Sequence, residues 1–178
     1  TNILLSATGV WVYGSITHGT NMAAATNALG QWIADNRVWI ACSNLTIASG
    51  GSINVDGRGY DRGTPYYNAH GPGAGVTGVN GGGGGGYGGY GGNGYNGGRG
   101  SPYGSYSNAL APGSGGGGCD ICCYPTYGAA GGGAVLIEAS GRMTVNGTLT
   151  ANGTDGAGRG AHGPRRNPSF LSRLIQRA

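Results

Sequence analysis

The sequence has little of the material from which an ordinary enzyme domain is built. Leu, Ile, Val and Phe account for 27 of its 178 residues, and only 9% of the residues are charged. The aliphatic share lies below the roughly one fifth at which a conventional hydrophobic core becomes doubtful. The low net charge excludes disorder driven by charge repulsion. A globular enzyme with a conventional core is therefore not expected.

Lysine is absent, and all ten basic residues are Arg. Five of them lie from Arg159 onward, where no acidic residue occurs, so the basic charge belongs to the tail. Nucleic-acid binding requires a sustained basic surface, which the body of the chain lacks. No apolar run approaches eighteen residues, so no membrane span is expected. The first residue is Thr1, which suggests a processed, secreted product.

Acidic residues are also scarce, and Asp56 and Asp61 are the only close pair. Polysaccharide-cleaving enzymes need paired carboxylates, whereas an Asp before Gly is typical of a turn. We predict no catalytic residue, no cofactor and no enzyme activity. Carbohydrate cleavage through Asp56 or Asp61 remains a less favoured alternative.

Cysteine occurs at four positions, Cys42, Cys119, Cys122 and Cys123. A structural zinc site normally needs two Cys-x-x-Cys pairs, or one such pair with suitably spaced His ligands. The chain has only the Cys119–Cys122 pair and no His residues at such a spacing, so no metal site is predicted. Four Cys in a secreted chain are typical of two disulfides. All three pairings stay open, and we expect Cys42 to join one member of the later cluster.

Glycine is abundant, with 44 residues, and 31 of these lie between Gly57 and Gly133. From position 81 to 101 every third residue starts an X-Gly-Gly triplet, with Tyr95 and Ser101 as the exceptions. Three residues per turn is the period of a polyproline-II-like helix. This pattern predicts ordered polyglycine passes that pack through their bare backbones. One ridge of side chains would follow the passes; it consists of Tyr87, Tyr90, Asn93, Tyr95, Asn96 and Arg99.

An internal repeat flanks this insert. Residues 38–57 align with residues 135–153, so that Val38 matches Val135, Leu45 matches Met143 and Ile53 matches Leu149. Each copy alternates apolar and polar residues in three short strands joined by Ser, Asn and Gly turns. Residues 9–18 have the same texture. Such a repeat buries its apolar face only by stacking on neighbours, which predicts a parallel β-helix.

Two helices are also expected. The first covers residues 20–35, with Asn21 as its N-cap. The second lies in the tail, with Asn167 as N-cap, Pro168 at the first helical position and an apolar stripe that includes Phe170 and Leu174.

The repeat, the Gly-rich insert and the segment 131–153 together resemble the Gly-rich right-handed β-helix regions of secreted and cell-surface proteins. The X-Gly-Gly stretch separately looks like the polyglycine bundles of certain phage tail-fibre adhesins and of a Gly-rich insect antifreeze protein. These resemblances imply an extracellular structural or binding role.

The expected fold is all-β: a short right-handed parallel β-helix, interrupted by a polyglycine-II-like insert and followed by a short C-terminal helix. Its expected parts are an N-terminal segment with the first rungs (1–57), the Gly/Tyr-rich insert (58–134), a further rung (135–158) and a basic tail (159–178).

The expected function is that of an extracellular structural subunit, which assembles with itself head to tail into a filament or surface layer. Open β-helix ends invite another chain. The expected contacts are the apolar residues of both chain ends: Ile3, Leu4, Leu5, Val10, Trp11, Val12, Phe170, Leu171, Leu174 and Ile175. An adhesin or receptor-binding tip that uses the tyrosine ridge, with glycans as partners, is the alternative, and ice binding is a weaker one. Asn44, Asn146 and Asn152 fit the glycosylation acceptor pattern.

Overall fold

The computed structural model describes residues 3–21, 26–104, 110–120, 126–156 and 173–176. Within these residues all regular structure is β, and no helix occurs. The first sheet contains β1 (Ile3–Val12), β3 (Val38–Ile47), β5 (Val135–Ala139), β6 (Met143–Val145) and β8 (Arg173–Gln176). The second contains β2 (Ser15–Ile16), β4 (Ser52–Asn54) and β7 (Thr148–Thr150). The expected all-β class is therefore confirmed.

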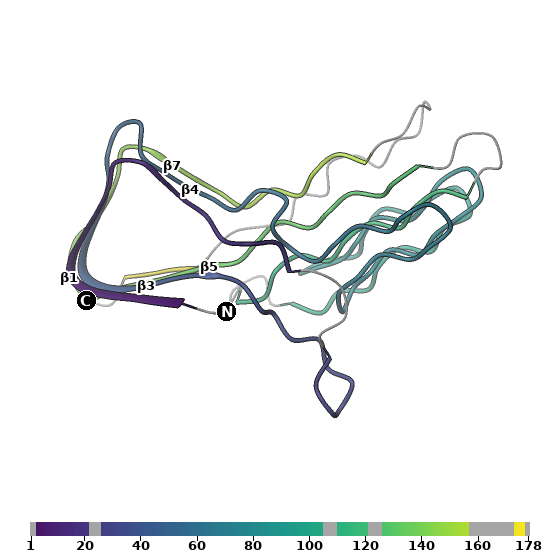
Figure 1. Cartoon of the computed structure of the whole chain (residues 1–178), viewed down its shortest axis with the longest axis horizontal. Helices are drawn as coiled ribbons and strands as arrows, with labels where there is room; N and C mark the ends of the chain where they lie inside the picture. The colour runs from purple at the N-terminus through teal and green to yellow at the C-terminus, as the bar shows by residue number, and fades with distance from the viewer. Residues whose placement is uncertain (1–2, 22–25, 105–109, 121–125, 157–172, 177–178) are drawn as a thin grey trace.

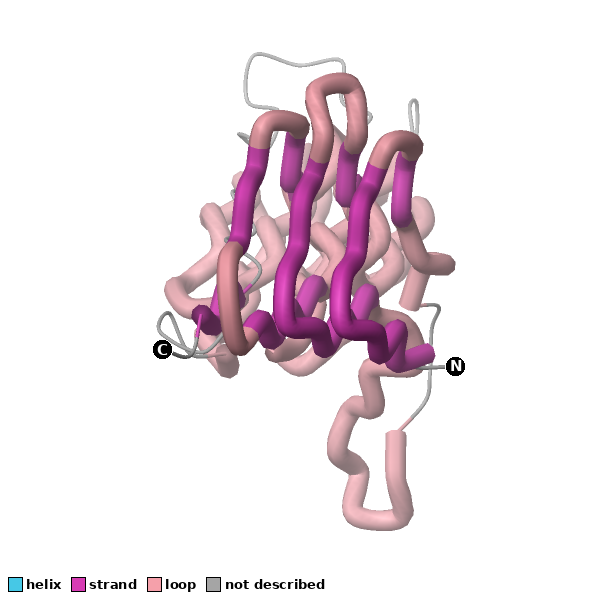
Figure 2. Tube along the Cα trace, turned by 90° about the vertical axis from the view of Figure 1, so that its left-hand side faces the viewer, coloured by secondary structure: helices cyan, strands magenta, loops and turns pink. Residues whose placement is uncertain are grey.

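Each long strand turns a corner into a short strand, and we call this unit a rung. Rung 1 consists of β1 and β2, rung 2 of β3 and β4, and rung 3 of β5, β6 and β7. The rungs lie side by side, with parallel pairing throughout (Figures 1 and 2). Val38 pairs with Val135, Leu45 with Met143 and Ile53 with Leu149. The structure thus confirms the register that the sequence repeat predicts.

The core lies between the two sheets and is made of aliphatic side chains from alternate strand positions. In β3 buried and partly exposed residues alternate along most of the strand, as expected for a strand with one buried face. The buried cluster comprises Val10, Val12, Val38, Ile40, Cys42, Leu45, Ile47, Ile53, Val55, Val135, Ile137 and Ala139. A small number of apolar residues is enough to fill this core, because the three rungs share one interior.

The corner after β3 requires a residue without a side chain. A Cβ at Gly51 would meet the carbonyl oxygen of Val12 in the neighbouring rung and lie 3.1 Å from the carbonyl oxygen of Ala48. Its neighbour Gly50 has φ of +83°, which side chains rarely allow. The Ser-Gly-Gly turn of the sequence therefore holds rungs 1 and 2 in close contact.

The Gly-rich segment from residue 58 to residue 134 extends away from the rungs as a set of adjacent passes (Figure 1). Its centre is the pass from Gly113 to Gly118, which is buried throughout. N–H groups of Gly113 and Gly116 donate to the 129–132 pass, at 2.9 and 2.7 Å. Those of Gly115 and Gly118 donate to His70 and Tyr67, and that of Gly117 donates to Gly83. N–H groups three residues apart thus donate to the same neighbouring pass, and the N–H groups of this central pass reach three different neighbours.

The remaining passes are joined by tight turns. Residues 73–78 run antiparallel to 81–86, with Gly86 N–H donating to Gly73 and Gly83 N–H to Val76. Residues 91–94 and 97–100 form a second such pair. The turns at residues 64–68, 78–81 and 94–97 meet at the end remote from the rungs, where Gly118 bonds to Tyr67 and Gly78 bridges to Cys119. We call these three segments the distal turns.

The first expected helix is wrong for the residues described. Thr26 and Trp32 form an antiparallel bridge, and residues 26–34 project as a loop. The Asn27 side chain accepts hydrogen bonds from the N–H groups of Leu29 and Gln31, and Gly30 has φ of +73°. Such local side-chain bonding competes with a helix, so a turn forms instead. Residues 22–25 lie outside the described part.

The predicted C-terminal helix is also wrong for those of its residues that the structure describes. Arg173–Gln176 is strand β8, which pairs in parallel with β5. An open sheet edge offers unpaired backbone groups, and such tertiary pairing overrides local preference. Its proposed cap and first turn, Asn167 to Leu171, lie outside the described residues.

Candidate functional site

The open face of rung 1 exposes part of the apolar interior. Leu5 pairs with Ile40, which pairs with Ile137, so these three residues form one column across the rungs. Ile40 and Ile137 are 1% and 0% exposed, whereas Leu5 is 44% exposed. Leu5 lies in the outer strand β1, beyond which no described strand pairs, and it is more exposed than Val10 and Val12 of the same strand, which are buried.

The opposite end of the stack, at rung 3, also exposes a core position to solvent. Val12, Ile47 and Val145 form another column, in which Val12 and Ile47 are 3% and 0% exposed. Val145, in rung 3, is 45% exposed. Both ends therefore present core positions to solvent, while the middle rung is covered.

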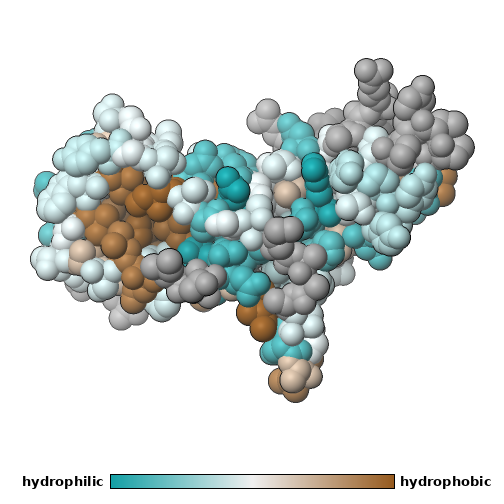
Figure 3. Space-filling view, viewed as in Figure 1, coloured by the Kyte–Doolittle hydropathy of each residue, from teal (hydrophilic) through white to brown (hydrophobic). Residues whose placement is uncertain are grey.

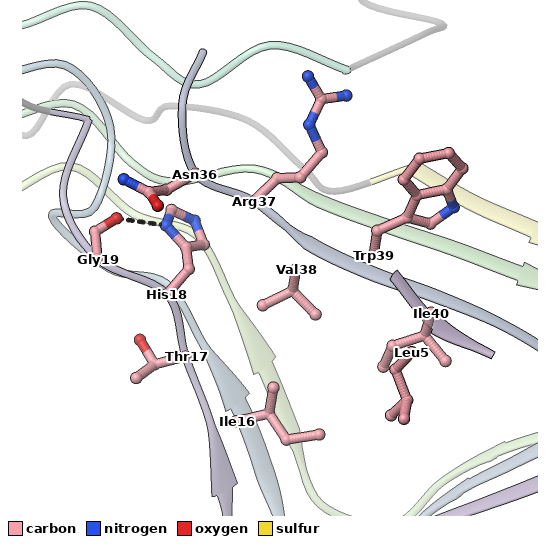
Figure 4. A pocket seen from close by; sticks show the side chains of 10 residues that line it. All are labelled: Leu5, Ile16, Thr17, His18, Gly19, Asn36, Arg37, Val38, Trp39 and Ile40. Carbon is pink, nitrogen blue, oxygen red and sulfur yellow. Dashed lines mark hydrogen bonds between the residues drawn. The ribbon is translucent and has the colours of Figure 1, made fainter. Parts of the chain in front are cut away.

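A pocket of about 470 Å³ opens at the rung 1 end. Apolar atoms gather at this end of the molecule, inside the outline of the strands (Figure 3). The pocket is lined by Leu5, Ile16, Thr17, His18, Gly19, Asn36, Arg37, Val38, Trp39 and Ile40. Leu5, Ile16, Val38 and Ile40 give its apolar part, and His18 and Asn36 lie close together at one side of it (Figure 4).

His18 joins this pocket to the start of rung 3. Its Nδ1 lies 2.6 Å from the carbonyl oxygen of Gly19, and its Nε2 accepts from the N–H of Ala134 at 3.2 Å. The two contacts select the neutral ring with the proton on Nδ1. Burial lowers the pKa of His18 from 6.5, and the nearby Arg58 lowers it further, against the opposing effect of the Gly19 hydrogen bond.

Acidification is therefore expected to destabilise the fold through His18. Because its pKa is lower in the folded chain, the unfolded chain takes up the proton first as the pH falls below 6.5. The stabilisation is present above that pH and is lost as the pH falls toward the folded-state pKa. Urea unfolding at pH 7.5 and at pH 5 should show a loss in the wild-type chain and a smaller one in His18→Gln. Equal losses in the two chains would contradict this role.

Nothing in the sequence indicated the role of His18, and the role predicted for Asn21 was wrong, since it is not a helix N-cap but bridges to Tyr60. The Asn21 side chain is 1% exposed; it donates to the carbonyl oxygens of Asn36 and Arg58 and accepts from the N–H of Asn36. It thereby ties the entry of β3 to the start of the Gly-rich segment. An isolated Asn or His in a polar stretch carries no local signal of such long-range contacts.

The predicted assembly residues are only partly at the surface. Leu4, Leu5 and Trp11 are 45%, 44% and 60% exposed, whereas Val10 and Val12 are core residues. The backbone of Ile3 lies in β1, and the backbones of Leu174 and Ile175 lie in β8 of the same sheet. Phe170 and Leu171 lie outside the described residues.

The predicted tyrosine ridge is divided between two ends of the Gly-rich segment. Tyr87 is buried, with its ring 5.2 Å from that of Tyr103 in an edge-to-face contact. Tyr90 is exposed beside it, and the Arg99 guanidinium lies 4.1 Å from its ring centre. Tyr95 and Asn96 belong to the distal turns instead, and Asn93 is exposed between the two ends. A single continuous ridge is therefore wrong, because the chain reverses at residues 87–90 and again at 94–97, so that Tyr90 and Tyr95 lie at opposite ends of one pass.

The structure shows no disulfide between Cys42 and Cys119, which are both free and buried. Cys42 packs in the strand core and Cys119 pairs with Gly78 in the distal part of the insert, so they belong to different regions. Burial raises the pKa of the Cys42 thiol. Cys122 and Cys123 lie outside the described residues.

The two acids of the alternative catalytic cluster both bond to backbone. An Asp56 carboxylate oxygen accepts from the N–H of Asn152 at 2.5 Å, and one of Asp61 accepts from the N–H of Arg62. Asp56 thus links the ends of rungs 2 and 3. Among the described residues, no group of three His, Cys, Asp or Glu side chains could hold a metal ion.

The three glycosylation candidates, Asn44, Asn146 and Asn152, are exposed. The Asn44 side-chain oxygen accepts from the N–H of Arg142 in rung 3 at 2.9 Å, which gives it a structural contact. Modification at these positions stays a prediction.

Comparisons with protein-family models, with curated proteins and with solved structures found no match to this chain. In the part of the chain that the structure describes, no helix is long and apolar enough to cross a membrane.

Proposed function

We propose that this chain is an extracellular structural subunit that stacks head to tail with copies of itself into a filament or surface layer. The observation that carries the proposal is the pair of open ends. Leu5 and Val145 are about half exposed in columns whose other members are buried. A second copy placed on either end would cover them.

Two copies can stack through the same parallel strand pairing that joins the rungs within one copy. A rung 1 that follows rung 3 of another copy would meet it as rung 2 meets rung 1, in a short parallel β-helix. Contacts between unlike ends do not close on themselves and so generate filaments. The low content of charged side chains does little to oppose association.

The Gly-rich segment would project from such a stack as a polyglycine-II-like bundle. Its support is the three-residue period of hydrogen-bond directions in the pass from Gly113 to Gly118. The bundle replaces a side-chain core by backbone contacts, and each subunit would display one.

Light scattering and electron microscopy of the full chain test the proposal. We expect mass growth with concentration and filaments of regular axial repeat. A stable monomer at millimolar concentration, with no filaments, would overturn the proposal.

A second candidate function is glycan or receptor binding by the distal turns. Tyr67, Val79 and Tyr95 are exposed there by 68%, 49% and 75%. Exposed aromatic rings can stack on sugar faces, and exposed apolar groups on loops are typical of binding surfaces. Tyr67→Ser with Tyr95→Ser should abolish binding to a glycan array or to cells while leaving filament formation unchanged. Tyr90→Ser, at the other end of the passes, is the matched control, and equal loss in that variant would contradict the assignment.

A further inference from the structure

Strand β8 covers one end of the first sheet. Its four residues pair with β5 in parallel, so that Leu136 faces Arg173, Ile137 faces Leu174, Glu138 faces Ile175 and Ala139 faces Gln176. The sheet order is β1, β3, β5, β8, so β1 and β8 are its two outer strands. β8 therefore lies at the face of rung 3 on which a further rung would stack.

The register shows which residues of a second copy would compete for this place. In rungs 1 and 2, Leu5 pairs with Ile40 and Ala7 with Cys42. In rungs 2 and 3, Ile40 pairs with Ile137 and Cys42 with Ala139. One more step of the same register places residues 4–7 of a second copy on residues 136–139. Those are the four positions that β8 occupies.

The rest of rung 3 is left uncovered. β7 is an outer strand of the second sheet, and β6 pairs with β3 alone among the strands described. The same register would bring Val10, Trp11 and Val12 of a second copy onto β6, and Ser15 and Ile16 onto β7. A second copy would thus offer pairing along all three strands of rung 3, whereas β8 supplies it along one.

From this coincidence of register, we propose that β8 is an intramolecular cap on the docking site for a second copy. This inference rests on the proposed stacking function, and it adds that β8 limits when a second copy can dock. In the free subunit β8 protects the edge of β5, which would otherwise be an open template. During assembly, β1 of the incoming copy displaces β8, because the longer pairing and the burial of Val145 outweigh four residues of strand.

The test uses the full chain with Leu174→Pro and Ile175→Pro. Proline removes the backbone donor and is excluded from a paired strand, so β8 no longer pairs with β5. Leu174→Val with Ile175→Val is the control, since both residues keep strand preference. We expect the proline variant to assemble at a concentration at least tenfold lower than the wild type and the control. In dilute monomer, its amides at residues 136–139 should exchange faster and regain protection on assembly.

Adding Leu5→Lys to the proline variant separates ordered stacking from aggregation of a misfolded chain. Stacking through β1 should be lost in this triple variant, whereas persistent assembly would mean aggregation and overturn the cap. Equal assembly thresholds in the proline variant and the wild type would overturn the cap and leave stacking intact. Absence of assembly in every chain would overturn stacking and the cap together.

Discussion

We expect Gly117→Ala to lower the free energy of unfolding by about 3 kcal/mol, the upper part of the range for overpacking a filled interior. A Cβ at Gly117 would meet the carbonyl group of Val76, with the amide nitrogen of Thr77 2.8 Å away. These are backbone atoms and cannot rotate aside as a flexible side chain would. The central pass would have to separate from the 73–78 pass, with loss of the hydrogen bonds that the N–H groups of Gly75 and Gly78 donate to Gly115 and Gly118.

The matched control is Gly92→Ala, in the same Gly-rich segment. An added Cβ at Gly92 meets nothing within 4 Å, and its φ is not in the left-handed region. Removing a glycine from a compatible position reduces the entropy of the unfolded chain, so we expect a change within about 0.5 kcal/mol or a small gain. Thermal unfolding should separate the two variants by roughly 6–12 °C. Equal melting temperatures would mean that backbone packing does not hold the Gly-rich segment together.

The second large effect is expected at the two ends of the stack. Leu5→Lys places a charge on the open face of rung 1, and Val145→Lys places one on the open face of rung 3. Both side chains are about half exposed in the free subunit, so the folded monomer should tolerate each change. In a stack, each ammonium would be buried without a partner, which costs several kcal/mol. We expect the concentration needed for assembly to rise at least roughly 100-fold, equivalent to about 2.7 kcal/mol.

A mixture of the two variants distinguishes unlike-end contacts from like-end contacts. Leu5→Lys keeps a competent rung 3 face and Val145→Lys keeps a competent rung 1 face. Head-to-tail stacking therefore predicts that neither variant assembles alone and that the mixture forms dimers that grow no further. Sedimentation velocity measures this directly. Tyr13→Lys, at a 74% exposed position in the corner after β1, is the control and should assemble as the wild type does. Like-end stacking would instead give dimers of each variant alone.

The strand core could be predicted because its signals are local and periodic. Alternation in Val38 to Ile47 indicates a strand with one buried face, and the match to residues 135–145 indicates parallel pairing in a definite register. Turn residues such as Gly50 and Gly51 mark the corners. The three-residue glycine period likewise predicted a set of packed passes.

The errors have a common physical cause. The two expected helices rested on apolar spacing in segments that other contacts control: Asn27 and Gly30 form a turn, and β8 joins the edge of β5. The tyrosine ridge failed because the passes reverse direction, which the X-Gly-Gly pattern does not encode. The role of His18 was missed, and that of Asn21 was wrongly predicted, because their partners, Ala134 and Arg58, are far away in sequence.

The sequence by itself determined that this chain builds a parallel all-β core and an ordered glycine-rich insert, because both depend on short-period patterns and on residues that permit close backbone approach. Only the tertiary structure decided which core positions stay open. Leu5, Ile40 and Ile137 are equivalent in the repeat, yet Leu5 alone is half exposed, since β3 and β5 have a paired strand on both sides and β1 has one on a single side. The same holds for β8, whose place is set by the free edge that it covers.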